Sequence, residues 1–330
     1  MSKSSGLSDT ALKDEDEERP SRIHIREYMT FENPTEAISG TRRSVQGFAI
    51  HGSIGFISYH TGIVAAYDLA AKNPSPIDVF TLGSYNPGEP DNRYTNHANQ
   101  GMFSSRYYDD GDEFPLLYVT AGNSGDTDEL GFISRCAVER ITRKNGRFTS
   151  ECVQTIVYNN NGIEATPYES PGWGWPASFV DSEHGFYYTF SARYRTTAAF
   201  LNQYDQNAYI VTKFRLPDID RHNLTTVLHP TVLRPRDILD QIIFPFDVLF
   251  TQGGVLRDGK IYYTFGAGKD PYPDAIRIFD LKKRRIVQRI DLSDCIFKNE
   301  EIECIDFYKD HILVNTQACK LYEIELESPL

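Results

Sequence analysis

Four side chains that carry oxygen atoms stand at equivalent places in this chain, each at the start of a short run of small and apolar residues. They are Gln46, Gln100, Gln252 and Glu303. Amide and carboxylate oxygens that converge on one point can hold a hard cation such as calcium or a chain of buried water. If the four runs are strands around one axis, they predict a calcium-like ion there. The alternative is that the side chains hydrogen-bond neighbouring strands, as buried polar groups must.

Two histidines are well placed for proton transfer. His97 lies in the run Asn96-His97-Ala98-Asn99, directly before the second of these strands, and His60 lies in a loop of the preceding repeat. Histidine exchanges protons near neutral pH more readily than any other side chain. We therefore expect His97, with His60 as the alternative, to act as a general base, although a histidine in such a place can also simply cap a turn. The sequence has no HExxH motif, so a catalytic zinc is not expected.

Arginine and tyrosine provide candidate groups for binding an anion. Arg193-Tyr194-Arg195 lies in a long segment, and Arg42-Arg43 precedes the first of the four strands. A guanidinium binds a carboxylate, sulfate or phosphate through two parallel hydrogen bonds. In an acidic chain these residues predict a local positive site, unless they serve only to solvate the surface.

Aromatic side chains in similar segments predict a platform for a sugar ring. Trp173 and Trp175 stand within Pro-Gly-Trp-Gly-Trp-Pro, and Tyr272 lies in another loop rich in glycine and proline. Flat aromatic faces beside polar groups suit stacking on a sugar, although tryptophan is equally common in a folded core. Polar contacts to the same substrate are expected from Asn99, Gln100, Arg193 and Gln252.

The elements that position these residues repeat along the chain. In the stretch from Gln252 to Leu281, a small-residue strand is followed by a turn that contains Asp258-Gly259, and then by the aromatic strand Ile261 to Phe265. Asp-Gly favours a hairpin because both residues tolerate positive φ, and aromatic and β-branched residues suit a sheet. Two further strands complete a four-stranded antiparallel unit of the propeller-blade type.

The same order of strands recurs, and such repetition predicts a closed ring. The first strands of the five copies begin at Gln46, Gln100, Pro176, Gln252 and Glu303. The fourth strand of the third copy is expected at Thr225 to Leu228. The last copy lacks a fourth strand, and Ile25 to Phe31 near the N-terminus can supply it. The sequence thus predicts an all-β, five-bladed β-propeller over residues 23–330, closed by pairing of the two chain ends.

Loop lengths predict which face of this ring carries the function. Turns between first and second strands are short, whereas the loops between second and third strands and the links between blades are long. Loops this long in a compact domain are usually functional or disordered. The long set comprises Gly83 to Asn99, Asn159 to Trp175, Ser191 to Asn207, His229 to Thr251 and Gly266 to Asp274. We expect the site on the face where the first strands begin.

Composition and charge limit the partners and the compartment. The chain has 330 residues and a net charge of −12, so neither nucleic acid nor a membrane is an expected partner. Residues 1–22 are polar, lack the apolar core of a signal peptide, and are expected to form a disordered tail. The five cysteines show no CxxC spacing, which indicates reduced thiols in a cytoplasmic protein.

Two further runs carry a family resemblance. Trp175 to Val180 followed by Gly185 to Tyr188 is similar in rhythm to inner strands of the five-bladed glycoside hydrolases. Those families place a catalytic Asp on such a strand, whereas this chain has Ser178 there, and Gln46 rather than Asp begins its first blade. The resemblance implies a carbohydrate-active propeller, but it does not carry over the two-carboxylate mechanism.

Three functions remain open from the sequence. The first is a lyase acting on a small sugar-derived substrate, with His97 or His60 as the base. Tyr194 or Tyr272 would be the acid, and arginines such as Arg195 would neutralise a uronate carboxylate.

The second function is a glycosidase in which Glu303 divides acid and base work with a loop carboxylate, Glu164 or Asp274. The third is a non-catalytic propeller that binds a ligand or another protein. A propeller fold hosts all three classes, so the fold by itself does not choose among them.

Overall fold

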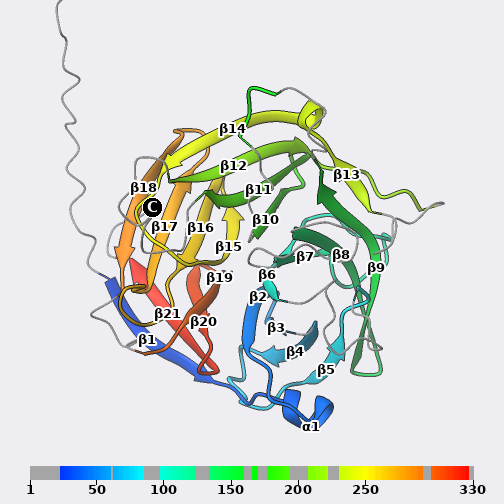
Figure 1. The fold of residues 1–330 in the computed structure, drawn as a ribbon. Coiled ribbons are helices and arrows are strands. Elements are labelled where there is room, and N and C mark those ends of the chain that lie inside the picture. The colour runs from blue at the N-terminus through cyan, green and yellow to red at the C-terminus, as the bar shows by residue number, and fades with distance from the viewer. Residues whose placement is uncertain are drawn as a thin grey trace, which may run out of the picture.

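Five antiparallel sheets stand around a common axis in the computed structural model of the protein (Figure 1). The structure describes residues 23–60, 62–84, 97–122, 134–159, 166–169, 177–193, 207–221, 230–292 and 299–326. In each sheet the first strand lies next to the axis and the later strands lie farther out (Figure 1). The predicted all-β, five-bladed β-propeller is confirmed.

The first four blades follow the chain. Blade 1 consists of β2 (Val45–His51), β3 (Ile54–Tyr59), β4 (Ile63–Asp68) and β5 (Asp78–Thr81). Blade 2 consists of β6 (Ala98–Phe103), β7 (Leu117–Gly122), β8 (Ser134–Lys144) and β9 (Arg147–Tyr158). Blade 3 consists of β10 (Ala177–Asp181), β11 (Phe186–Arg193), β12 (Ala208–Arg215) and β14 (Ile238–Pro245). Blade 4 consists of β15 (Thr251–Arg257), β16 (Lys260–Phe265), β17 (Ala275–Asp280) and β18 (Arg285–Asp291).

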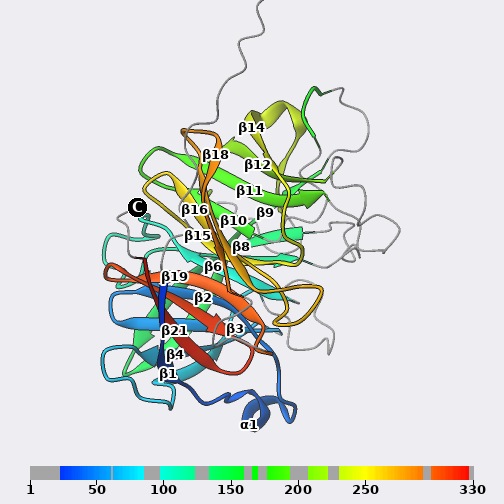
Figure 2. The ribbon, with the colours of Figure 1, turned by 90° about the vertical axis from the view of Figure 1, so that its left-hand side faces the viewer.

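Blade 5 joins the two ends of the chain. It consists of β19 (Ile302–Tyr308), β20 (His311–Thr316), β21 (Lys320–Leu326) and β1 (Ile23–Thr30). β1 lies beside β21 in both views (Figure 1, Figure 2), in an antiparallel register that places Ile25 opposite Ile324. Arg26 also donates through its Nε, at 3.0 Å, to a carboxylate oxygen of Glu323. The predicted closure by an N-terminal strand is confirmed.

The fourth strand of blade 3 differs from the prediction. Thr225 to Leu228 lies outside the described residues, and β14 pairs with β12 in that place. The prediction that His229 to Thr251 is one long loop is therefore wrong. This segment also contains β13 (Thr231–Leu233), which adds a parallel fifth strand to blade 2 beside β9, and the 3-10 helix η2 (Pro235–Asp237). Prolines on both sides of β14 hid the strand pattern in the sequence.

Helices contribute little to the described part of the chain. The α-helix α1 (Thr35–Ser39) has five residues. No helix within the described ranges is long and apolar enough to cross a membrane.

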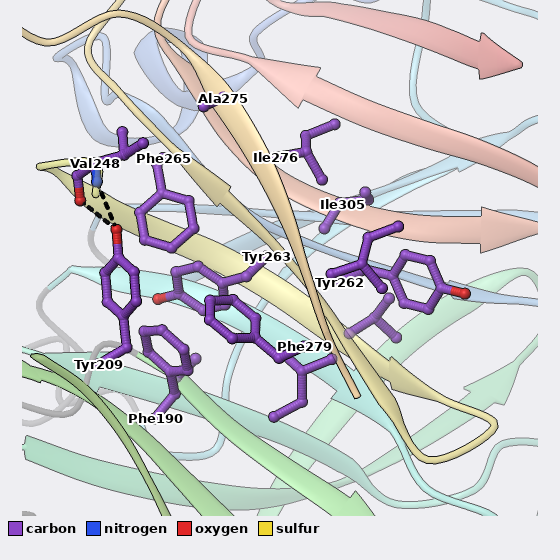
Figure 3. Packing of buried hydrophobic residues seen from close by; sticks show 14 of the residues in the cluster. Phe190, Tyr209, Val248, Tyr262, Tyr263, Phe265, Ala275, Ile276, Phe279 and Ile305 are labelled. Carbon is purple, nitrogen blue, oxygen red and sulfur yellow. Dashed lines mark hydrogen bonds between the residues drawn. The ribbon is translucent and has the colours of Figure 1, made fainter. Parts of the chain in front are cut away.

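Aromatic rings fill the seam between blades 3 and 4 (Figure 3). Phe190 stacks on Tyr263 with ring centroids 4.2 Å apart. The hydroxyl of Tyr209 donates to the carbonyl oxygen of Val248 at 2.6 Å and accepts from its N–H at 2.8 Å (Figure 3). Because Val248 belongs to the link between β14 and β15, this buried tyrosine fixes the path of the chain from blade 3 to blade 4.

Glycine after the polar residue of the inner strand allows the blades to close on the axis. A Cβ atom on Gly253 would lie 2.8 Å from the carbonyl oxygen of Asn99 and 2.6 Å from Cys304 Sγ. A Cβ atom on Gly47 would lie 2.9 Å from the carbonyl oxygen of Ala98. These separations are too short for any side chain, so the repeated Gln-Gly pair is a packing device that brings inner strands into direct contact.

Candidate active site

The described residues of the predicted site lie on one face, where the first and third strands of the blades begin. His60 follows β3, His97 immediately precedes β6, Gln252 is the second residue of β15, Asp274 immediately precedes β17 and Glu303 is the second residue of β19. The predicted residues that fall outside the described part are Glu164, Trp173, Trp175, Tyr194 and Arg195, together with the side chain of Arg193 at the end of β11.

The two histidines lie together between blades 1 and 2. The ring centroids of His60 and His97 are 5.1 Å apart, and the N–H of His97 donates to the carbonyl oxygen of His60 at 2.9 Å. His97 has a φ of 61°, in the left-handed region that few non-glycine residues adopt and that histidine tolerates better than most. Strained backbone of this kind concentrates at functional sites. The carbonyl oxygen of His97 also accepts from the N–H of Asn99 at 2.7 Å.

Both imidazoles are neutral at neutral pH. Burial, together with the neighbouring His60, lowers the pKa of His97 to about 4. Burial and the guanidinium of Arg43 lower the pKa of His60. The Nε of Arg43 is buried and has no hydrogen-bond partner among the described residues. The structure thus combines two proton acceptors with a guanidinium that can receive an anion.

Blades 4 and 5 add two buried carboxyl groups to this face. The Glu303 side chain is only 2% exposed, and its Oε1 has no hydrogen-bond partner in the described part of the chain. Burial, and then the charges of Glu301 and Asp274, raise the pKa of Glu303 well above its usual range. Burial also raises the pKa of Asp274 to about 7, although the N–H of Gly268 donates to its Oδ1 at 3.0 Å. Burial therefore favours the protonated form of Glu303.

The two sides border one place on the axis. Gly253 packs against the carbonyl oxygen of Asn99, two residues after His97, and against Cys304, the neighbour of Glu303. Blades 2, 4 and 5 therefore meet here, on the face that carries the two histidines and the two buried carboxyl groups. Proton acceptors and proton donors on one face suit general acid–base chemistry.

The glutamine side chains at the starts of the inner strands serve mainly to join the blades. Gln100 is fully buried; its Nε2 donates to the carbonyl oxygen of Gly254 at 3.1 Å, and its Oε1 accepts from Thr120 and from the N–H of Ser178. Gln252 donates to the carbonyl oxygen of Gly266 and to a carboxylate oxygen of Glu301.

Two side-chain oxygens at the starts of the inner strands are available to bind a ligand. Gln46 Oε1 and Glu303 Oε1 are buried without a hydrogen-bond partner among the described residues. The calcium-like ion remains a prediction, and it depends on these two oxygens.

One group of described residues brings three potential metal ligands within 4.8 Å of one another: His311, Glu323 and Glu325. The carboxylate of Glu323 already accepts hydrogen bonds from the guanidinium of Arg26. We therefore assign this group to the closure of the ring by β1 rather than to a metal.

Sequence reasoning missed two residues of this face. Glu301 raises the pKa of both buried acids, and the cluster of Glu300, Glu301 and Glu303 was its available signal in the sequence. Phe250 lies with its ring centroid 4.7 Å from that of Tyr272 and is 37% exposed. Nothing in the apolar run Val248-Leu249-Phe250 distinguishes it from its buried neighbours.

Four cysteines fall within the described residues. They are free at Cys136, Cys152, Cys304 and Cys319. Cys295 lies outside the described residues.

Comparison with protein-family models and with curated protein sequences finds no match. Among solved structures, the crystal structure of Myxococcus xanthus glutaminyl cyclase is similar to this chain, with a TM-score of 0.50 and 15% sequence identity. The similarity covers 93% of this chain and 98% of that one. A computationally designed protein, Ika8, aligns with a TM-score of 0.33 and 7% identity over 87% of this chain and 72% of that one. The first likeness supports the propeller fold over nearly the whole chain, and the similar structure is that of an enzyme.

Proposed function

We propose that this propeller is an enzyme that transfers protons on a small sugar-derived substrate, and that the reaction is elimination beside a uronate carboxylate. The observation that supports it is the pair of neutral imidazoles, His60 and His97, next to the guanidinium of Arg43. A base beside a carboxylate-binding cation is the pairing that elimination from a uronate requires.

The chemistry follows from this arrangement. Arg43 binds the substrate carboxylate and reduces the charge that builds up when the adjacent carbon loses its proton. His97 accepts that proton, and the electrons of the C–H bond form the carbon–carbon double bond as the C–O bond to the leaving sugar breaks. The substrate carboxylate also raises the pKa of the nearby imidazole and so makes His97 a stronger base in the complex.

The leaving oxygen needs a proton. Burial, with the charge of Asp274 among the further causes, raises the pKa of Glu303 well above its usual range, and burial raises the pKa of Asp274 to about 7. We assign the proton donor to this pair. Both residues lie on the same face of the ring as His97, at the starts of β19 and β17.

A glycosidase is the second candidate, because the same two carboxyl groups influence each other. Glu303 would donate the proton and Asp274 would serve as base or nucleophile, which is the division of labour in glycoside hydrolysis. The likeness to a glutaminyl cyclase adds a glutaminyl peptide as a further substrate class to test. Reduced thiols favour a location inside the cell, where an oligosaccharide or a smaller molecule is the expected substrate.

Product analysis separates these reactions. The purified protein is incubated with digalacturonate, with the neutral disaccharide lactose and with a peptide that begins with glutamine. A product with ultraviolet absorbance from a new conjugated double bond supports elimination. Reducing sugar without absorbance supports the glycosidase, ammonia released from the peptide supports cyclisation, and binding without turnover supports a non-catalytic propeller.

The residue assignment is tested on whichever substrate reacts. His97→Asn keeps a residue that tolerates positive φ and should lower kcat by about 10²- to 10⁴-fold, as loss of a general base does. His184→Asn is the matched control, because His184 is exposed in the turn between β10 and β11, on the other face. Full activity of His97→Asn would show that this histidine is not the base.

A further inference from the structure

Phe250 combines an exposed ring with an unfavourable backbone. Its φ is 67°, a left-handed conformation that is a genuine outlier for a bulky residue. Its ring is 37% exposed, although Val248 and Leu249 directly before it are buried. A phenylalanine in this conformation gains little from burial, so packing alone does not explain why the ring stands here.

The neighbouring structure holds Phe250 in this position. Tyr209 fixes Val248 through two hydrogen bonds, and the N–H of Gly266 donates to the carbonyl oxygen of Phe250 at 2.8 Å. The chain is therefore anchored before Phe250 and at Phe250 itself. The exposed ring is a fixed feature of the face rather than a loose side chain.

Tyr272 completes an aromatic surface. Its ring centroid is 4.7 Å from that of Phe250, at an angle of 43°. The tyrosine is held by its own loop, because its carbonyl oxygen accepts from the N–H of Ala267 at 3.0 Å and its N–H donates to the carbonyl oxygen of Lys269. The two rings come from separate segments, and both segments are anchored by backbone hydrogen bonds.

This aromatic surface adjoins the acid side of the candidate active site. The loop that carries Tyr272 ends at Asp274, two residues later, and Phe250 stands two residues before Gln252, which donates to Glu301 at 2.9 Å. The Tyr272 segment therefore carries Asp274 itself, and the Phe250 segment contacts Glu301, two residues before Glu303.

We propose that Phe250 and Tyr272 form a stacking subsite for a pyranose ring. An aromatic face packs on the C–H groups of a sugar, and the polar groups beside it can bind the hydroxyls. The inference rests on the proposed function in one respect: because the proton donor lies on this side, the ring that stacks here is the leaving-group sugar. The substrate then has at least two sugar rings, and a monosaccharide uronate is bound weakly.

Binding measured without turnover tests the subsite. Digalacturonate and galacturonate are titrated by calorimetry into protein that carries His97→Asn, which slows turnover, and saturation-transfer NMR identifies which sugar ring contacts aromatic protons. We expect the disaccharide to bind more tightly than the monosaccharide, and Phe250→Gly and Tyr272→Ala each to weaken the disaccharide about five- to tenfold, as loss of one stacked ring predicts. Tyr107→Ala is the matched control, since Tyr107 is an exposed aromatic in the loop between β6 and β7, on the other face.

Phe250→Gly also separates lost binding from lost folding. Glycine adopts a φ of 67° without strain, so this variant should melt at or above the temperature of the wild-type protein. Unchanged disaccharide affinity in Phe250→Gly, or no binding of digalacturonate by the wild-type protein, would overturn the subsite. If the disaccharide binds in a way that depends on Phe250 but no turnover is found, the subsite stands and the proposed reaction fails. If Phe250→Gly converts digalacturonate with an unchanged KM, the proposed reaction stands and the subsite fails.

Discussion

Glu303 occupies the place that glutamine holds in three other blades. Gln100 and Gln252 use their amides to bind neighbouring backbone or side chains, whereas Glu303 is buried without such a partner among the described residues. A carboxylate buried in this way is costly, and the group avoids the cost by keeping its proton. Blade 3 has no glutamine at this place either, since its first strand begins after Pro176, but only blade 5 puts an acid there, where packing does not require one. Such local departures tend to occur at functional sites.

His97 gives the stability of the protein a pH dependence of known sign. In the unfolded chain histidine takes up a proton near pH 6.5, whereas burial lowers the pKa of His97 in the folded protein to about 4. Between these values the unfolded state binds more protons, so the free energy of unfolding falls as the pH decreases. From about pH 7 to about pH 5, we expect wild-type protein to lose about 1–2 kcal/mol more than His97→Asn. Urea unfolding at the two pH values measures this.

His184 supplies a control of opposite sign. Its hydrogen bond to Asp181 raises the pKa of this exposed histidine, so its stabilising contribution is present at low pH and is lost as the pH rises. His184→Asn should therefore make the protein slightly less stable at about pH 5 and change little at about pH 8. Equal acid sensitivity of wild-type protein and His97→Asn would show that the buried imidazole is not desolvated in the folded state.

At the scale of the strand, the second residue of the Gln-Gly pair decides whether the ring can close. Gly253→Ala would place a Cβ atom 2.8 Å from a backbone oxygen, which the structure cannot relieve by rotating a side chain. We expect a loss of about 1–3 kcal/mol in the free energy of unfolding, as for other overpacked cores. Denaturant titration of the purified variant measures it.

Gly101→Ala is the matched control for this strand-level test. It alters the same Gln-Gly pair in blade 2, but its added Cβ atom would meet Ala49 Cβ at 3.4 Å, an ordinary contact. We expect it to stay within about 1 kcal/mol of the wild-type protein, because alanine also reduces the entropy of the unfolded chain. If Gly253→Ala and Gly101→Ala lost equal free energy of unfolding, the flexibility of glycine, and not close approach across the axis, would explain the Gln-Gly pair.

The strands were predictable where local pattern and turn chemistry agree, and the site was predictable only in part. The turn at Asp258-Gly259 and the alternating strands of blade 4 followed from short-range rules. β14 was missed because the prolines near its two ends weaken the strand pattern, although pairing with β12 makes it a strand in the fold. The placement of His97 beside an inner strand could be read from spacing, but its lowered pKa arises from burial against another blade. No feature of the sequence predicts the positive φ of Phe250.

The whole ring depends on the joining of the two chain ends. β1 is the outer strand of blade 5 and brings Met29 and Phe31 into the core. It also neutralises Glu323, a buried carboxylate on β21, through the guanidinium of Arg26. A propeller without such closure would expose the edge of β21, and exposed edge strands promote aggregation.

Removal of these parts in two steps tests the closure. Deletion of residues 1–22, which precede β1, should leave the melting temperature unchanged. Deletion of residues 1–32 removes β1, the apolar burial of Met29 and Phe31 and the partner of Glu323. We expect this shorter protein to aggregate or to lose its cooperative thermal transition, as followed by circular dichroism and size-exclusion chromatography. Arg26→Gln, which keeps the β1–β21 ladder but not the charge, should lower the melting temperature much less. A monomer that lacks residues 1–32 and still unfolds cooperatively at the wild-type temperature would mean that blade 5 is stable with three strands and that pairing of the chain ends does not hold the ring together.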